Sequence, residues 1–285
     1  MISFEFDYSR PGTIEEALGL LADGEAKVLA GGMSLIPMMK LRLAAPPRLI
    51  DVARLTELKG IAISGNEIVL GAATTHQEVE DSILIRTRCP LLAESAASIG
   101  DIQVRNTGTI GGSTAHNDPA ADYPAALLAL GARVELRSAT GRRSVGIAEF
   151  FLDTLTTALE PGEIITSVVV PVEEPGTGTA YVKMPQPASG YAQVGVAVRL
   201  TRQKGKIAWI RVGVTGVGPN AYRAMAVEEA LQGTAGTPQD VVSAAALVAH
   251  HIDVNSDIHA SAAYRAQMAI VFAKRAIQSA LERIV

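Results

Sequence analysis

AGGMSLIP, residues 30–37, and TIGGS, residues 109–113, are two glycine turns that lie far apart in the chain. Each turn places two adjacent glycines near a Ser or Thr. Because glycine has no Cβ, the backbone N–H groups of such a turn can approach a phosphate closely, and a neighbouring hydroxyl adds a further donor. Two turns of this kind indicate one long ligand with a diphosphate in its middle. The sequence therefore predicts a dinucleotide cofactor that is held by two separate segments.

Each turn taken alone has a simpler explanation, because a strand–Gly–Gly–helix connection is often a plain tight turn. The neighbours of the first turn favour a ligand. Ser34 brings a hydroxyl and a backbone N–H to the turn, and Pro37 suits the first turn of a helix whose N-terminus would face an anion. Two better-known nucleotide motifs, the P-loop GxxxxGK[ST] and the Rossmann GxGxxG, are absent from the sequence. Gly213-x-x-Gly216-x-Gly218 has reversed spacing and is interpreted as a loop.

Composition bounds the class of protein. The chain has 285 residues, 48% of them hydrophobic, so it is long enough for a large core and for two domains. A formal net charge of −4 with scattered basic residues argues against a nucleic-acid partner. The single cysteine, Cys89, excludes an internal disulfide and a cysteine-ligated iron–sulfur cluster within this chain, and it fits a reduced, cytoplasmic setting.

Targeting segments and metal sites are not expected. The first ten residues do not resemble a secretory signal, and no apolar run approaches the roughly 20 residues that span a bilayer. His250 and His251 are adjacent in a predicted helix and would point to different faces, which makes them a poor metal pair.

Local patterns predict a mixture of helices and strands. Thr13 and Glu16 have the spacing of a capping box, before a helix that begins at Ile14. Further helices are expected over residues 75–81, 91–99 and 119–130 and in the tail from about 238, and strands over 27–30, 49–52, 67–71 and 133–137. Apolar residues alternate over residues 194–200 and again over 210–214, around a turn at 204–206. This pattern predicts a hairpin with one buried face.

A change in composition marks a candidate domain boundary. Residues 171–178, PVEEPGTG, contain two prolines and two glycines. Before them helices and strands are mixed, and after them strands precede helices, which is an α+β pattern. We expect one domain over residues 1–175 and a second over residues 176–285.

The motifs resemble those of a known family. Residues 30–42, AGGMSLIPMMKLR, are similar to the first FAD motif in the medium subunit of molybdenum hydroxylases, with the closest pattern in the flavoproteins of aerobic carbon monoxide dehydrogenases. Residues 103–113, QVRNTGTIGGS, are similar to the second motif. The segment from Asp118 to Asp122 and the later Lys183 also match, and the resemblance covers essentially the whole chain in order and length.

The resemblance implies an α+β fold. Its first part is the FAD-binding fold of the vanillyl-alcohol oxidase and p-cresol methylhydroxylase type, built from two α+β subdomains with FAD between them. Its second part is a small α+β domain with a three-stranded sheet and helices.

The resemblance also assigns residues to the cofactor. The first turn is implied to line the diphosphate, and the second turn to form a second cradle; the residues are Ala30, Gly31, Gly32, Met33, Ser34 and Leu35, then Thr109, Gly111, Gly112 and Ser113. Many relatives carry histidine where this chain has Met33, but a backbone N–H serves there whatever the side chain. Relatives often carry asparagine or aspartate at Ser113.

Four later residues are implied to lie near the flavin. Asp122 matches an aspartate that contacts the flavin or its ribityl chain, and its alternative role is a helix N-terminal carboxylate. Ile165 matches a position whose backbone meets the pyrimidine end of the ring. Lys183 matches a lysine near the pyrimidine edge, with a surface lysine as the alternative. Tyr191 matches an aromatic beside the isoalloxazine that could gate it, or is a half-buried tyrosine that opens a strand. At Ile99 some relatives stack a phenylalanine on the adenine.

The implied function is electron transfer without a catalytic acid or base in this chain. FAD, bound non-covalently, would take electrons from [2Fe-2S] clusters of a small partner subunit and pass them to an external acceptor such as a quinone, dioxygen or NAD. A large partner subunit would hold the molybdenum–pterin cofactor. A cytoplasmic dimer of heterotrimers is expected, with any contact to the inner face of the membrane made through partners.

Two alternatives remain open. One is a stand-alone flavin oxidoreductase of the same broad fold, such as the enzyme that reduces enolpyruvyl-UDP-N-acetylglucosamine. The small second domain and Lys183 argue against it. The other is an assembly subunit that has lost its flavin, and the intact glycine turns argue against that.

Overall fold

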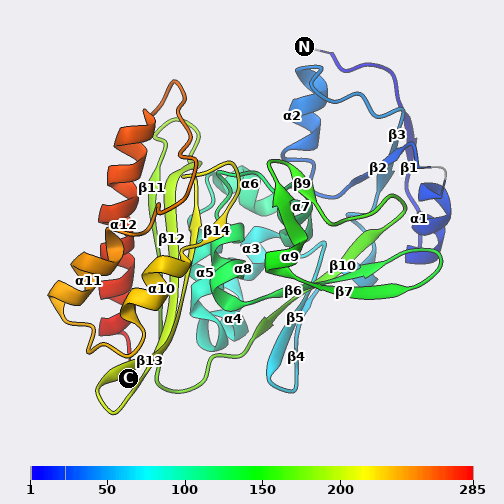
Figure 1. The fold of residues 1–285 in the computed structure, drawn as a ribbon. Helices are drawn as coiled ribbons and strands as arrows, with labels where there is room; N and C mark the ends of the chain where they lie inside the picture. The colour runs from blue at the N-terminus through cyan, green and yellow to red at the C-terminus, as the bar shows by residue number, and fades with distance from the viewer. Residues whose placement is uncertain (1, 23, 285) are drawn as a thin grey trace.

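A computed structural model describes residues 2–22 and 24–284 (Figure 1). Its first unit is a small parallel sheet with strand order β1-β3-β2, made from β1 (Asp7–Ser9), β3 (Arg48–Asp51) and β2 (Ala26–Leu29). Helix α1 (Ile14–Leu21) buries its apolar stripe against this sheet, and α2 (Leu35–Lys40) follows the first glycine turn. Figure 1 shows α2 standing beside this sheet, apart from the other helices.

The predicted cap of α1 is present with one change of partner. Thr13 Oγ1 accepts a hydrogen bond from the Glu16 N–H at 3.2 Å, as expected for an N-cap. The Glu16 carboxylate accepts from the N–H of Gly12 at 2.6 Å rather than from that of Thr13. The expected capping pair therefore forms, with its second bond moved back by one residue.

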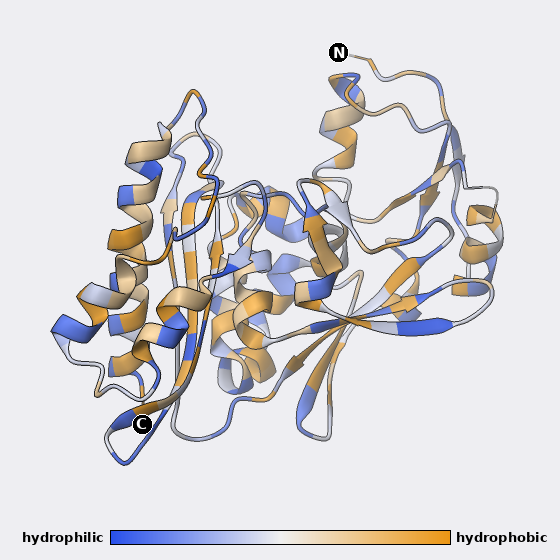
Figure 2. Cartoon of the chain, in the orientation of Figure 1, coloured by the Kyte–Doolittle hydropathy of each residue, from blue (hydrophilic) through white to orange (hydrophobic). Residues whose placement is uncertain are grey.

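The second unit is a five-stranded antiparallel sheet with helices packed on it. Its strand order is β4-β5-β10-β6-β7: β4 (Ile61–Ser64), β5 (Glu67–Gly71), β10 (Ile164–Pro171), β6 (Arg133–Arg137) and β7 (Arg142–Gly146). Between β5 and β6 the chain forms α3 (His76–Asp81), α4 (Ile83–Arg88), α5 (Pro90–Ala97), α6 (Ile102–Thr107), α7 (Ile110–His116) and α8 (Tyr123–Leu130). Figure 2 shows β7, at the edge of the sheet, as hydrophilic, which suits an exposed edge strand.

Short elements complete this unit. They are η1 (Thr56–Leu58), α9 (Ile147–Phe150), β8 (Phe151–Asp153) and β9 (Thr156–Thr157). The main core lies between the sheet and the helices, and α8 is buried along its whole length. The return of the chain to β10, between β5 and β6, ties the early and late parts of this unit together.

The third unit is an antiparallel sheet with strand order β11-β12-β13-β14. Its strands are β11 (Thr177–Pro185), β12 (Ala192–Gln203), β13 (Lys206–Thr215) and the two-residue β14 (Tyr222–Arg223). The expected three strands are thus joined by a very short fourth. Helices α10 (Met225–Leu231), α11 (Pro238–Ala245) and α12 (Ala262–Glu282) cover one face, and α5 and α8 cover the other (Figure 1).

The predicted hairpin between β12 and β13 is present, but the expectation of one buried face is wrong. Val196 and Val198 pack on the α12 side, while Ala197, between them, is buried on the α8 side. The second face is closed because its residues are small. A Cβ built on Gly213 would lie 2.0 Å from the carbonyl oxygen of Ala125 in α8, so only glycine lets the helix approach this closely.

Candidate cofactor site

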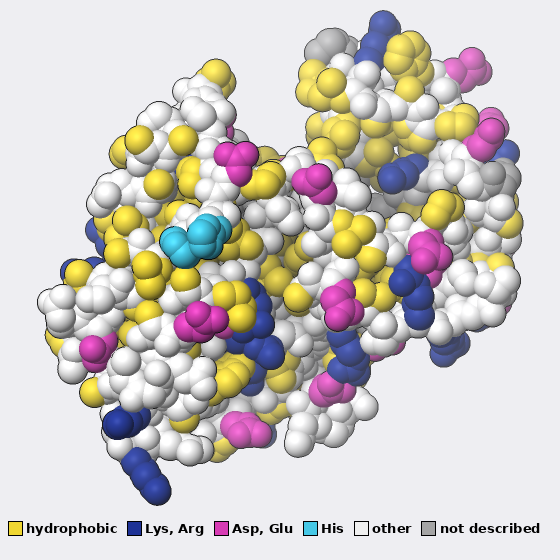
Figure 3. Space-filling view, in the orientation of Figure 1, with side chains coloured by type: hydrophobic (Ala, Val, Ile, Leu, Met, Phe, Trp, Pro, Cys, Tyr) yellow, Lys and Arg dark blue, Asp and Glu magenta, His cyan; other side chains and the backbone are white. Residues whose placement is uncertain are grey.

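One cavity of about 960 Å³ joins the two predicted turns. This volume is at the upper end of the roughly 300–1,000 Å³ range of small-molecule and cofactor sites. All the residues predicted from the sequence line it, except Lys183: Ala30, Gly31, Gly32, Met33, Ser34, Leu35, Thr109, Gly111, Gly112, Ser113, Asp122, Ile165 and Tyr191. Figure 3 shows the surface hollowed between the small sheet with α2 and the rest of the molecule.

The first glycine turn connects β2 to α2. Gly32 has a φ of 71°, in the left-handed region that favours glycine, and its carbonyl accepts from the N–H of Ile36 at 3.0 Å. Within the described part of the chain, no protein group accepts a hydrogen bond from the N–H groups of residues 31–34. Ser34 precedes α2 without a side-chain cap bond. Because α2 has only six residues, these open backbone donors, rather than a helix dipole, are what the turn offers to an anion.

The second glycine turn begins α7, and the N–H groups of residues 110–113 already have acceptors within the protein. Gly111 N–H donates to Ala72 O at 2.9 Å, and Ile110 N–H donates to Thr74 O at 3.0 Å. Gly112 N–H donates to Thr109 Oγ1 at 3.1 Å, which makes Thr109 the N-cap. The second turn therefore forms a fixed wall of the cavity, and the hydroxyls of Thr109 and Ser113 are its side-chain donors.

Folding brings the two turns into contact. A Cβ built on Gly31 would lie 2.1 Å from Thr107 O and 2.6 Å from Gly108 Cα, so the backbone before the second turn touches the first turn. A Cβ on Gly111 would lie 2.5 Å from Ala72 Cβ. Glycine at both positions is thus required by the close approach of the protein's own backbone, whatever ligand the cavity holds.

Asp122 and Lys183 form a buried ion pair at one wall of the cavity. Lys183 Nζ donates to Asp122 Oδ2 at 2.8 Å and to Ser98 O at 2.8 Å, and both side chains are 6% exposed. Burial raises the pKa of Asp122 to about 6, and the nearby Lys183 and Tyr181 act against that rise. The alternative of a surface lysine is therefore wrong, and Asp122 makes no side-chain cap bond to α8.

The structure changes the expectation for Lys183 in one respect. Its ammonium is bound behind Asp122 and is not among the groups that line the cavity. The resemblance placed a lysine beside the flavin. Here the carboxylate of Asp122 lies at the cavity wall and forms an ion pair with the lysine. Sequence alone gives no sign of this, because the two residues lie 61 positions apart.

Ile165 and Tyr191 differ in their exposure to solvent. Ile165 is 5% exposed and sits in β10 where the pairing with β6 is shifted. Tyr191 is 45% exposed and belongs to the connection between β11 and β12. Ile99, at the end of α5, also lines the cavity. The cavity thus has a buried apolar wall at Ile165 and a partly open aromatic one at Tyr191.

His76 lines the same cavity, and sequence analysis did not single it out. Its side chain is nearly buried, and its ring meets the ring of Tyr123 edge-on at 5.2 Å. Its Nδ1 has no partner among the described residues. Burial, helped by the charge of Arg105, lowers the pKa of His76 to about 4, so the ring is neutral near pH 7. The helix start at Thr75 was the only local signal at this position.

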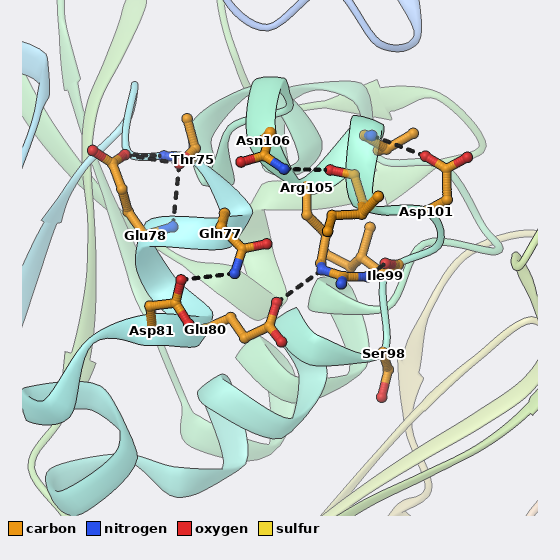
Figure 4. Close-up of polar contacts among 12 residues, drawn as sticks. Thr75, Gln77, Glu78, Glu80, Asp81, Ser98, Ile99, Asp101, Arg105 and Asn106 are labelled. Carbon is orange, nitrogen blue, oxygen red and sulfur yellow. Dashed lines mark hydrogen bonds and ion pairs between the residues drawn. The ribbon is translucent and has the colours of Figure 1, made fainter.

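Polar contacts hold the second motif in place (Figure 4). Arg105, in α6, forms an ion pair with Glu80 of α3 at 2.8 Å and donates to Ile99 O at 2.7 Å. Asp101 accepts from the N–H groups at the start of α6, and Thr75 forms a full capping box with Glu78. Arg105, the arginine of the QVRN segment, therefore clamps α6 onto α3, which positions the backbone that meets the first turn.

The residues present fit FAD. The first turn offers unpaired backbone donors, the second turn closes against it, and Asp122 provides a carboxylate at the wall of a cavity large enough for a dinucleotide. No group of three or more His, Cys, Asp or Glu in the described ranges is placed to hold a metal. No helix within residues 2–22 and 24–284 has the length and apolar character needed to cross a bilayer.

Comparisons with known proteins show the family of this chain. Residues 4–173 match the family described as FAD binding domain in molybdopterin dehydrogenase, and residues 179–280 match the CO dehydrogenase flavoprotein C-terminal domain. The carbon monoxide dehydrogenase medium chain of Hydrogenophaga pseudoflava is 40% identical over 99% of both chains. The glyceraldehyde dehydrogenase medium chain of Sulfolobus acidocaldarius is 37% identical over 96% of this chain and 98% of the relative.

Solved structures show the same fold. A carbon monoxide dehydrogenase from Hydrogenophaga pseudoflava, which lacks the Mo-pyranopterin moiety of its cofactor, superposes with a TM-score of 0.97 at 42% identity, over 100% of both chains. Quinoline 2-oxidoreductase from Pseudomonas putida 86 has a TM-score of 0.94 at 30% identity, again over 100% of both. The family and the α+β fold expected from the two motifs are confirmed. This chain belongs to the family of FAD-binding medium subunits of molybdenum hydroxylases, and it is an oxidoreductase subunit whose cofactor is FAD.

Proposed function

We propose that this chain carries one non-covalent FAD as the electron-transfer subunit of a molybdenum hydroxylase complex. The observation that carries the proposal is the meeting of two glycine turns at one cavity where the first turn has unpaired N–H donors. The glycine pairs of the two turns lie 79 or more residues apart in sequence. When bound, FAD supplies the capacity to accept electrons from one partner and release them to another. The protein's part is to bind and orient the cofactor.

The residues divide this work between them. The N–H groups of residues 31–34 hold the diphosphate, and Thr109 and Ser113 add hydroxyl donors from the facing turn. Asp122 accepts hydrogen bonds from the ribityl hydroxyls or from the ring N3–H. Ile165 forms the apolar wall beside the ring, and Tyr191 covers the ring on the open side. None of these roles requires a general acid or base.

Partner subunits provide the remaining redox centres in this proposal. Cys89 is fully buried, and burial raises the pKa of its thiol, so it is not a cluster ligand. A small [2Fe-2S] subunit and a large molybdenum–pterin subunit would complete a cytoplasmic dimer of heterotrimers. A quinone, dioxygen or NAD would take the electrons at the end. Residues 1–175 would form the FAD-binding domain and residues 176–285 the second domain.

A glycine variant with a matched control tests the binding of FAD. Gly32→Val adds a branched side chain to the first turn at a φ of 71°. The control, Gly65→Val, adds the same side chain at a φ of 61° in the β4–β5 turn. A Cβ at Gly65 meets nothing within 4 Å. We expect the full chain and the Gly65→Val variant to retain one FAD per chain, and Gly32→Val to lose it. Equal flavin content in both variants would overturn the proposal.

The complex is tested by its metals. Purification together with the proteins encoded beside this chain should give iron, acid-labile sulfide and molybdenum in the same fraction as the flavin. A yellow chain that reacts directly with a reduced nicotinamide, and that binds no such partners, would favour the stand-alone oxidoreductase instead.

A further inference from the structure

Tyr181, in β11, contacts the candidate site without lining its cavity. Its hydroxyl donates to Asp122 Oδ1 at 2.5 Å, while Lys183 donates to Asp122 Oδ2 at 2.8 Å. Asp122 is 5% exposed, so each oxygen of a buried carboxylate is held by one donor from the third unit of the fold. Burial raises the pKa of the Tyr181 hydroxyl well above its usual value of 10, which keeps it protonated and able to donate.

The sheet leaves space for this contact. Lys183 pairs with Gly195 across β11 and β12, and a Cβ on Gly195 would lie 2.5 Å from the Tyr181 hydroxyl oxygen. Glycine at 195 therefore admits the tyrosine ring. The N–H of Tyr181 donates to Glu94 Oε2 at 2.9 Å, which fixes the strand against α5. The side chain is thus oriented by its surroundings before any ligand is present.

The contact is not needed to attach the segment before α8 to the third unit. Thr215 Oγ1 donates to the carbonyls of Pro119 and Ala121 at 3.0 and 2.8 Å, and the N–H of Ala192 donates to Ala120 O at 3.1 Å. These bonds join the segment to β12 and β13 independently of Tyr181. The specific effect of the tyrosine is to fix the direction of one carboxylate.

The remaining acceptor capacity of that carboxylate points to a ligand. A carboxylate has about four lone-pair sites, and the two protein donors use one on each oxygen. Asp122 also lines the cavity. A carboxylate that is already desolvated and oriented forms a further hydrogen bond at a lower entropic cost than a mobile one.

We propose that Tyr181 is a positioning residue of the flavin site, which with Lys183 orients the Asp122 carboxylate toward the flavin half of FAD. Through this contact β11 sets the affinity for the flavin without lining the cavity. The inference rests on the proposed function. In it, residues of the two glycine turns bind the diphosphate half of FAD.

Two ligands and a set of variants test this inference on the full chain, freed of flavin. Tyr181→Phe removes the hydroxyl that holds Asp122. The control Tyr222→Phe also removes one tyrosine hydrogen bond, a partly buried one to Val248 O at 3.0 Å, on the far side of the same sheet. FAD is titrated by flavin fluorescence and ADP by calorimetry, because ADP shares the diphosphate but lacks the flavin.

We expect Tyr181→Phe to weaken FAD binding by about tenfold, as for a lost hydrogen bond to a charged group, and to leave ADP binding unchanged. Tyr222→Phe should bind both ligands like the parent chain. Tyr181→Phe added to Asp122→Asn should weaken FAD binding little further, because the tyrosine acts through that carboxylate. A strengthened or unchanged FAD affinity, or an equal loss for FAD and ADP, would overturn the positioning role. Failure of the parent chain to bind FAD would instead overturn the proposed function, and with it this inference.

Discussion

The two glycine turns look alike in sequence and do different work in the structure. In the first turn, the N–H groups of residues 31–34 have no acceptor within the described protein, so they are available to a ligand. In the second turn, the N–H groups of residues 110–113 bond to the protein's own oxygens. A Gly–Gly pair with a hydroxyl therefore permits close approach, but what approaches, a ligand or another segment of chain, depends on the fold.

The largest expected effect breaks the second turn. Gly111→Val would place a branched side chain where a Cβ alone lies 2.5 Å from Ala72 Cβ and 2.7 Å from Ala72 O. We expect a loss of about 3 kcal/mol or more in the free energy of unfolding, because neither backbone can move without breaking the Gly111–Ala72 hydrogen bond. Urea denaturation of the flavin-free chain measures it. A stable variant that only fails to bind FAD would show that the second turn serves the ligand as the first does.

The next effect concerns His76, which packs beside the second turn. A Cβ on Gly108 would lie 2.6 Å from His76 Nε2, so the ring fills the space under that segment. Its pKa is lowered from 6.5 to about 4, first by burial and then by Arg105. Between pH 6.5 and pH 4, this ring is therefore protonated to a greater extent in the unfolded chain than in the folded chain.

The contribution of the neutral His76 ring to the free energy of unfolding is present above the pKa of the ring in the unfolded chain. It is lost as the pH falls toward 4. The loss should reach about 3 kcal/mol between pH 6.5 and 4 in the flavin-free chain. His116, whose pKa burial also lowers, adds to the same slope. Urea denaturation at several pH values should show a shallower slope in His76→Gln than in the parent chain or in His259→Gln, which alters an exposed ring. Identical slopes in all three would mean that His76 is not buried as a neutral ring.

Thr109 gives a smaller and more specific test of the second turn. Thr109→Ala removes the oxygen that accepts from the Gly112 N–H at 3.1 Å and should cost about 1 kcal/mol of unfolding free energy, as for other N-caps. Thr109→Ser keeps the oxygen and should recover most of that loss. If alanine cost nothing, Gly112 would not depend on the threonine, and its N–H would be free for a ligand.

Ser34 in the first turn should show the smallest effect on stability. It makes no side-chain cap bond to α2, so Ser34→Ala should change the unfolding free energy of the flavin-free chain by less than about 0.5 kcal/mol. FAD affinity, measured by flavin fluorescence, should nevertheless fall, because alanine lacks the hydroxyl that Ser34 adds to the open N–H donors of the first turn. A stability loss equal to that of Thr109→Ala would erase the difference between the two turns.

Much of the fold could be predicted because it depends on neighbours in sequence. Thr13 caps α1 as its spacing to Glu16 predicts, since a cap needs only residues three positions apart. The helix expected over residues 75–81 is present as α3, which Thr75 caps. Lys204 and Gly205 turn the β12–β13 hairpin with φ values of 50° and 76°. The buried second face of that hairpin was missed, because small residues such as Ala197 are compatible with solvent or with a closely packed helix.

The sequence by itself determined the family, the cofactor and most of the cavity lining, because each depends on short motifs whose backbone geometry is local. Only the tertiary structure decided the roles within that lining. In it, Lys183 and the Tyr181 hydroxyl both donate to Asp122. N–H groups of the second turn donate to the carbonyl oxygens of Ala72 and Thr74. The physical reason is that each hydrogen-bond donor could pair with many acceptors in the chain. Packing between segments that are distant in sequence selects the acceptor that it contacts.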